Sequence, residues 1–223
     1  MNTRILFTAL SLAFLFLACS PPPQKGESHN SQSPFKKVSQ EKLDESSKAY
    51  FASGCFWCVE AIFESVTGVE EVVSGYSGGK SSTATYREVS SGSTRHAEAV
   101  VVYYDPAAVS YATLLKVFFG SHDPTTLNSQ GPDHGPQYRS AIFYQNDSEK
   151  TAARNYIKQL ENEGVYDGPI VTEVVPFEAF YDAEEYHQDF ERRNPDQGYV
   201  KAVSVPRLNR FKAKFPDLLK GSH

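Results

Sequence analysis

The stretch AYFASGCFWCVEAIFESVTG, residues 49–68, decides the predicted fold of this chain. Its apolar start, residues 49–52, predicts a short strand, and Gly68 marks the end of the element that follows. Between them, four apolar residues recur at i, i+3, i+4 and i+7, the spacing of one helix face: Val59, Ile62, Phe63 and Val66. A strand therefore runs straight into a helix, and Cys55 and Cys58 stand at the start of that helix.

Similar patterns place the remaining elements. Apolar runs predict strands over residues 69–76, 97–104, 141–145 and 171–175. Helical spacing predicts helices over residues 110–119, 148–163 and 183–193, the last begun by a capping box of Asp182 and Glu185. The order β-α-β-β-α-β, then α-β and a last helix, predicts an α+β fold. We expect a two-layer, ferredoxin-like (split βαβ) sheet with additional helices and with long, functional loops at residues 77–95 and 121–139.

Composition excludes several classes of protein. The chain has 223 residues, of which 40% are hydrophobic, so it can bury a core and is not globally disordered. Lys plus Arg is 22 and Asp plus Glu is 27, a net charge of −5 with no basic block, which argues against nucleic acid as a partner. Three cysteines are too few for a disulfide scaffold.

The N-terminal segment is predicted to be an export signal. Arg4 precedes an apolar stretch over residues 5–17, which has the length of a signal-peptide core and is too short for a comfortable membrane span. Leu17-Ala18-Cys19 resembles a bacterial lipoprotein signal, in which Cys19 would be lipidated. We therefore expect a signal peptide (1–19), a disordered tether (20–48) and a folded domain (49–223) anchored at the cell envelope. The alternative is a plain secretory signal and a soluble periplasmic or secreted protein.

Cys55 is the first candidate for chemistry. A thiol at a helix N-terminus is shifted toward the thiolate, because unpaired backbone N–H groups and the helix dipole favour negative charge there. Gly54 would leave room for a substrate, and Phe56 and Trp57 would form an aromatic wall. The alternative reading is that Cys55 and Cys58 are buried core cysteines.

Glu98 is the second candidate. Period-2 alternation places it on one strand face with Val100, Val102 and Tyr104. If that face is buried, desolvation raises the carboxyl pKa and keeps the group protonated, so that it can donate a proton. The alternative is a charge at the start of a strand that reaches water.

A metal site is not expected. One Cys-x-x-Cys offers two thiolates, whereas a closed structural zinc site needs four ligands. No helical spacing joins the other potential ligands, which are His122, Asp123, Asp133 and His134.

The motifs resemble one family, the methionine sulfoxide reductase A family, or peptide-methionine (S)-S-oxide reductases. Gly54-Cys55-Phe56-Trp57 looks like its active-site signature. Further segments match in the same order: 75–79 (GYSGG), 85–89 (TYREV), 96–98 (HAE), 104–106 (YDP), 110–111 with 114–115, 122–125 (HDPT), 130–140 (QGPDHGPQYRS) and 180–188 (FYDAEEYHQ). The resemblance covers about residues 50–194.

The resemblance implies a mechanism. Cys55 would attack the sulfoxide sulfur and become a sulfenic acid, and Glu98 would protonate the sulfoxide oxygen. Tyr86 and Tyr138 would hydrogen-bond that oxygen. The remaining implied roles concern substrate binding: Asp133 would orient the substrate backbone through water, and Phe56 and Trp57 would enclose the S-methyl group. Oxidised proteins or peptides would be the substrates, and free methionine sulfoxide a further one.

The departures from the family concern regeneration. Many relatives resolve the sulfenic acid with cysteines after a Gly-Tyr pair, but here Gly198-Tyr199 precedes Val200, and no cysteine follows Cys58. Cys58 stands where many relatives have glycine. We expect Cys58 to form a disulfide with Cys55, which an external thioredoxin-like dithiol reduces, and no bound cofactor is implied. The alternative is that Cys58 only packs and an outside thiol resolves Cys55. The rival functions are a thioredoxin-like disulfide oxidoreductase and a non-enzymatic surface lipoprotein.

Overall fold

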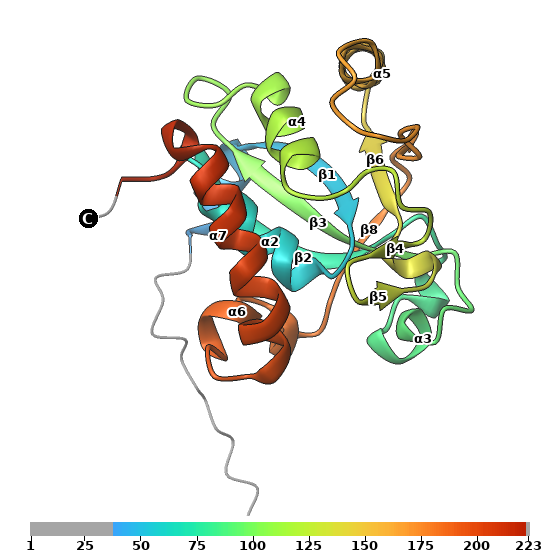
Figure 1. Ribbon diagram of the computed structural model, residues 1–223. Coiled ribbons are helices and arrows are strands. Elements are labelled where there is room, and N and C mark those ends of the chain that lie inside the picture. Colours follow the sequence, from blue (N-terminus) through green and yellow to red (C-terminus); the bar gives the residue numbers. More distant parts are fainter. Residues whose placement is uncertain (1–37, 222–223) are drawn as a thin grey trace, which may run out of the picture. The chain divides into compact units, whose positions relative to one another are not determined.

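The computed structural model describes residues 38–221 (Figure 1). The predicted signal peptide, Cys19 and most of the tether lie outside these residues. The strands are β1 (Ser47–Ser53), β2 (Val69–Ser77), β3 (Ala97–Tyr104), β4 (Ser129–Gln130), β5 (Asp133–His134), β6 (Ser140–Tyr144), β7 (Glu173–Pro176) and β8 (Phe180–Asp182). The α-helices are α1 (Gln40–Glu45), α2 (Phe56–Glu64), α3 (Tyr86–Ser90), α4 (Tyr111–Gly120), α5 (Asp147–Asn162), α6 (Phe190–Arg193) and α7 (Val205–Lys214). Short 3-10 turns occupy Ser81–Thr83, Pro136–Tyr138, Glu185–His187 and Pro216–Leu218, and a π-helix, η4, occupies Val200–Ser204.

Six strands form one sheet in the order β7-β6-β1-β3-β2-β8, while β4 and β5 form a separate hairpin. All neighbours in the sheet pair antiparallel except β6 and β7, which pair parallel. Each of the two units β1-α2-β2 and β3-α4-β6 therefore connects parallel strands that are separated by one antiparallel strand. The predicted fold class, in which one sheet is combined with helices, is confirmed.

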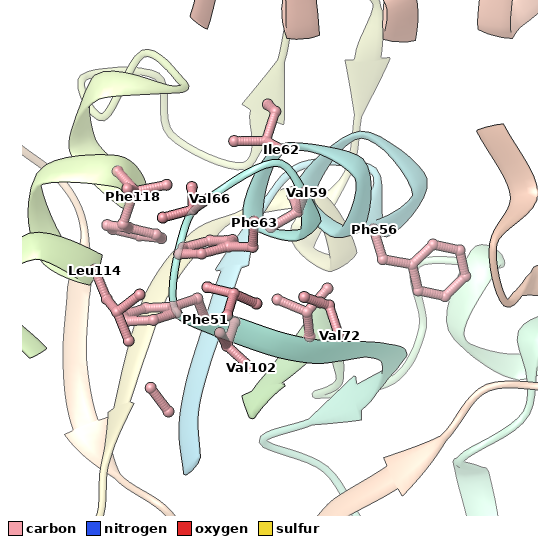
Figure 2. Close-up of a cluster of buried hydrophobic side chains, with 14 of the residues drawn as sticks. Phe51, Phe56, Val59, Ile62, Phe63, Val66, Val72, Val102, Leu114 and Phe118 are labelled. Carbon is pink, nitrogen blue, oxygen red and sulfur yellow. The ribbon is translucent and has the colours of Figure 1, made fainter. Parts of the chain in front are cut away.

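The two faces of the sheet are covered differently. Phe51 of β1 lies opposite Val100 of β3 and Ile142 of β6, and all three belong to the larger apolar cluster, to which α2 and α4 also contribute (Figure 2). The other face buries a smaller cluster around Tyr50, whose ring stacks on Phe177 with centroids 3.9 Å apart. Helices thus cover one face and the segment after β7 covers the other.

Local sequence accounts for most helix boundaries. Ser110 and Asn146 cap α4 and α5 by accepting the backbone N–H three residues on, at Thr113 and Glu149. The predicted strand at residues 97–104 coincides with β3, and the predicted helices at 110–119 and 148–163 are each confirmed to within one residue.

The predicted helix at residues 183–193 is wrong. The chain instead forms β8, one 3-10 turn and the four-residue α6, and Asp189 adopts a left-handed φ of 55°. Tertiary hydrogen bonds explain the break: the Gln188 side chain bonds the backbone N–H and C=O of Ser74, and Glu60 accepts the N–H of Asp189. These contacts outweigh the helical pattern.

The ordered domain also starts earlier than the predicted boundary at residue 49. Ser39 caps α1, Leu43 is buried, and Lys42 pairs with Glu70 at 2.5 Å, so residues 40–45 pack on the domain as a helix before β1 begins at Ser47. No helix within residues 38–221 has the length and apolar character that a membrane span requires.

Candidate active site

The turn between β1 and α2 carries the two cysteines. Gly54 has φ 89°, which favours glycine, and a Cβ there would lie 2.7 Å from Cβ of Gln130. The space that Gly54 was predicted to leave for a substrate is therefore occupied by Gln130. Cys55 is the N-cap of α2, and its carbonyl oxygen accepts the N–H of Cys58 at 3.2 Å.

The prediction that the helix start ionises Cys55 is wrong. Both thiols are buried, Cys55 at 6% exposure and Cys58 at 1%. Burial raises the pKa of the Cys55 thiol, and its hydrogen bond with Cys58 raises it further. The pKa of Cys58 is lowered to about 6, first by the hydrogen bond from Cys55 and then by the charge of Arg207, against desolvation. Cys55 and Cys58 therefore form one coupled pair, in which burial holds the pKa of the first thiol up and the hydrogen bond holds the pKa of the second down.

Glu98 belongs to β3, and its carboxyl group reaches the start of α2 beside Cys55. Its Oε2 accepts the backbone N–H of Phe56 at 3.1 Å, and the residue is 2% exposed. Burial raises the pKa of this carboxyl to about 8, partly opposed by the Phe56 N–H. The predicted buried strand face is confirmed, and Glu98 keeps its proton at neutral pH.

Tyr86 and Tyr138 reach the same region from α3 and from the 3-10 turn before β6, and both are half-buried. Burial raises the pKa of both phenols, and Glu98 and Cys55, once they ionise at high pH, raise it further in each case. Both hydroxyls therefore stay protonated and able to donate near Cys55. The backbone N–H of Tyr86 donates to Oε1 of Glu184 at 2.9 Å, which anchors the start of α3.

The aromatic pair after Cys55 divides between core and site. Phe56 is 1% exposed and packs on Tyr76, so it forms an inner wall. Trp57 is only partly buried; its ring stacks on Phe190 with centroids 3.7 Å apart, and its Nε1–H donates to Nδ1 of His187 at 3.2 Å. The predicted aromatic wall is present, with Trp57 as its more exposed member.

Asp133 lies at the start of β5 with one carboxylate oxygen bonded to the hydroxyl of Tyr199 at 2.5 Å. The Tyr199 oxygen is also 3.9 Å from Sγ of Cys58. Desolvation raises the pKa of Asp133, opposed by the bond from Tyr199. Asp133, Tyr199 and the cysteine pair therefore form one connected group.

Three residues in or near this group, Tyr199, His187 and Arg207, were not identified from the sequence. Tyr199 had been noted only as the position before a missing cysteine, and Val200 after it is fully buried. His187 stands in the matched 180–188 segment and is 1% exposed, wedged between Trp57 and the ring of Tyr86, whose centroid is 4.4 Å away. Arg207 carries no local signal at all.

His122, which the sequence offered as a potential metal ligand, uses both ring nitrogens in hydrogen bonds within the protein. Nδ1–H of His122 donates to the carbonyl of Phe118 at 2.7 Å, its Nε2 accepts from Ser140 at 2.8 Å, and burial lowers its pKa to about 3, so it is a neutral core histidine. Carboxylates that could share a cation lie within 4.8 Å of one another at Glu60, Glu64 and Asp189. Arg192 pairs with the latter two, which supplies positive charge there.

Comparison with known proteins decides the family. A family model described as peptide methionine sulfoxide reductase matches residues 47–219. The chain belongs to the peptide methionine sulfoxide reductase family. The reductase is 52% identical over 174 residues to peptide methionine sulfoxide reductase MsrA 1 of Rhodopirellula baltica, covering 78% of this chain and 90% of that one. It is 53% identical to MsrA 2 of Synechocystis, covering 78% and 81%.

Solved structures agree. The reductase matches Mxr1 of Saccharomyces cerevisiae in its reduced form with a TM-score of 0.64 and 32% identity, covering 72% of this chain and 91% of that one. It matches methionine sulfoxide reductase A of Corynebacterium diphtheriae with a TM-score of 0.60 and 34% identity, covering 67% and 76%. The protein is therefore an oxidoreductase of the methionine sulfoxide reductase A type.

Proposed function

We propose that this reductase converts the S epimer of methionine sulfoxide, in oxidised proteins and peptides and in the free amino acid, to methionine through a sulfenic acid on Cys55. In this reaction Sγ of Cys55 attacks the sulfoxide sulfur and forms a transient S–S bond. As that bond and the S–O bond of the substrate break, the oxygen passes to Cys55 and forms a new S–O bond, which leaves methionine and Cys55 as S–OH. The sulfoxide sulfur is reduced and the cysteine sulfur is oxidised, so the step needs no other reductant.

The protonated, buried Glu98 beside Cys55 is the observation that carries this proposal. A sulfoxide oxygen leaves sulfur poorly as an anion, so a proton must reach it as the bond breaks. Glu98 is held at the same helix start as Cys55 by the Phe56 N–H, and with a pKa of about 8 it holds that proton at neutral pH. An ionised carboxylate at this place would repel the developing oxyanion.

The cysteine pair supplies the attacking thiolate. Because the two thiols are hydrogen-bonded, one proton can pass from Cys55 to Cys58 and create the nucleophile where the substrate binds. No net charge has to be brought into the site. The thiolate character that the helix start was expected to give Cys55 directly is supplied through its neighbour.

The surrounding side chains fit substrate binding. Tyr86 and Tyr138 keep their protons and can donate to the sulfoxide oxygen, while Trp57, stacked on Phe190, offers a rigid apolar surface to the S-methyl group. The second Asp133 oxygen, beyond the one bonded to Tyr199, can orient the substrate backbone through water.

Regeneration would pass through Cys58. The Cys58 sulfur attacks the Cys55 sulfenic sulfur, the S–O bond breaks, and water leaves as the Cys55–Cys58 disulfide forms. A thioredoxin-like dithiol then reduces that disulfide and is itself oxidised. The absence of any cysteine after Cys58 in the sequence supports this route, since no C-terminal thiol is there to resolve Cys55.

We further propose that the enzyme repairs oxidised methionines outside the cytoplasm, anchored to the cell envelope through a lipid on Cys19. The signal-like residues 1–19 support this placement, and a soluble exported enzyme is the alternative outcome. The order β6-β1-β3-β2 supports classing the central sheet with ferredoxin-like, split βαβ folds.

The test is turnover of the separated S and R sulfoxides of an N-blocked methionine with dithiothreitol. We expect the full-length protein to reduce only the S epimer and Cys55→Ser to reduce neither. Cys19→Ser is the matched control, because it is the same chemical change outside the described residues, and it should retain activity. Reduction of neither epimer by a folded protein would contradict the proposal. Dithiol–disulfide exchange without sulfoxide turnover would instead favour a disulfide oxidoreductase.

A further inference from the structure

We infer that Arg207 is a positioning residue for Cys58: its guanidinium holds the negative charge of the Cys58 thiolate, both when Cys58 resolves the sulfenic acid and when it leaves during reduction. This inference rests on the proposed resolving role of Cys58. Arg207 is distant in sequence from the cysteines, and the packing of α7 on α2 brings its guanidinium to Ser53 and Gly54, the residues directly before Cys55.

The position of the guanidinium is fixed by backbone oxygens of the active-site turn. Nε–H of Arg207 donates to the Ser121 carbonyl at 2.9 Å, and Nη2–H donates to the Ser53 carbonyl at 3.0 Å. Nη1 lies 3.5 Å from the point where a Cβ on Gly54 would be. With only 7% of the residue exposed, the charge cannot swing into solvent and stays beside the turn that leads to Cys55.

The hydroxyl groups of Ser204 and Tyr199 also lower the pKa of Cys58, but each does so by less than the charge of Arg207. The Tyr199 hydroxyl has one proton and donates it to Asp133 at 2.5 Å. The Ser204 hydroxyl likewise donates to Glu191. Each hydroxyl is therefore committed to a carboxylate, whereas the guanidinium is a permanent cation.

The titratable groups around the cysteine pair come from several elements. They are Tyr86 on α3, Glu98 on β3, Asp133 on β5, Tyr138 before β6, Tyr199 before η4 and Arg207 on α7. Of these, Arg207 alone bears a positive charge. The hydrogen bond from Cys55 is the largest cause of the lowered Cys58 pKa, but it is lost when Cys55 becomes oxidised, whereas the charge of Arg207 remains.

Both steps of regeneration, resolution of the sulfenic acid and reduction of the disulfide, use the positive charge of Arg207. For resolution, the Cys58 sulfur forms the S–S bond as the S–O bond of the sulfenic acid breaks. The proton that the Cys58 thiol gives up passes to the departing oxygen, which leaves as water. For reduction, a donor thiolate attacks Sγ of Cys55, which is the more exposed sulfur, and the electron pair of the broken S–S bond goes to Cys58. A leaving thiolate of low pKa leaves faster. The second donor thiol then releases Cys55, so that two electrons pass from donor to enzyme.

The experiment titrates Cys58 in full-length protein that carries Cys19→Ser and Cys55→Ser, by ultraviolet absorbance of the thiolate. Because a neighbouring opposite charge lowers a pKa by roughly 1–3 units, adding Arg207→Met should raise the Cys58 midpoint by about one unit or more. Arg207→Lys, which keeps the charge, should restore most of the shift. Arg210→Met is the matched control on the same helix and should leave the midpoint in place. Equal midpoints with and without Arg207→Met would overturn the inference.

A second measurement follows disulfide formation after one turnover without reductant, in protein with Cys55 and Cys58 intact. At neutral pH, Arg207→Met should slow formation of the disulfide roughly two- to tenfold, matching the lost thiolate fraction, and the difference should vanish in alkaline solution where Cys58 is ionised in both proteins. Loss of only one thiol per turnover in the parent would defeat the proposed resolving role itself. Loss of two thiols with no effect of Arg207→Met would defeat only the role of Arg207. Circular dichroism of each variant separates misfolding from both outcomes.

Discussion

Replacing Glu98 by Gln should stabilise the fold at neutral pH while removing the proton that catalysis needs. Folding moves the pKa of this buried carboxyl from 4.5 to about 8. Between those values the unfolded chain has lost the proton and the folded chain keeps it. The unfolded state therefore binds fewer protons, and the free energy of unfolding falls as pH rises through this window.

The magnitude follows from the width of the window. Each pKa unit corresponds to about 1.4 kcal/mol, so at about pH 7.5, three units above the unfolded value, Glu98 destabilises the fold by about 4 kcal/mol. The variant amide has no such penalty and its oxygen can still accept the Phe56 N–H. Glu98→Gln should therefore gain about 4 kcal/mol at pH ~7.5 and almost nothing near pH ~4.5.

Urea unfolding of parent and variant across this pH range measures the difference directly, with Glu161→Gln on the exposed side of α5 as the matched substitution. Methionine formation in a single turnover should fall about 100-fold or more in Glu98→Gln, and in the parent it should decline above about pH 8 as Glu98 ionises. A difference in unfolding free energy that does not change with pH would refute this reasoning, because Glu98 would then be ionised in the folded protein and would have no proton to give.

Three further substitutions test how the fold supports the site. Phe63→Ala removes a fully buried ring between sheet and helices and should lower the unfolding free energy by about 3–5 kcal/mol in urea titrations. Gly75→Ala places a Cβ 2.4 Å from the Tyr181 carbonyl oxygen, so it should separate β8 from β2 and lower the melting temperature. Gly198→Ala is the control: no atom lies within 4 Å of its Cβ, so this variant should melt at the same temperature as the parent. Gln188→Ala leaves the backbone of β2 without its partners and should reduce stability by about 2–4 kcal/mol, with faster amide exchange in β2; unchanged exchange would contradict that assignment.

Sequence periodicity captured the elements that local chemistry controls. The strand at residues 97–104 is confirmed without change, because its nearly continuous apolar run is buried against both faces of the sheet. The segment at residues 183–193 also has a helical pattern but is broken at Asp189. The Gln188 side chain binds the backbone of Ser74 in β2, and Glu60 in α2 accepts the N–H of Asp189. A pattern cannot include partners that only the fold supplies.

The candidate site divides in the same way. From sequence alone it followed that a strand meets a helix at Cys55, that Glu98 shares a strand face with Val100 and Val102, and that the motifs resemble those of one reductase family. Only the tertiary structure decided the directions in which the two thiol pKa values shift, because burial of Cys55 and the nearby charge of Arg207 depend on how the helices pack. Residue types and spacing determine which groups are present, whereas desolvation and distant charges determine their protonation, and both of those arise only when the chain is folded.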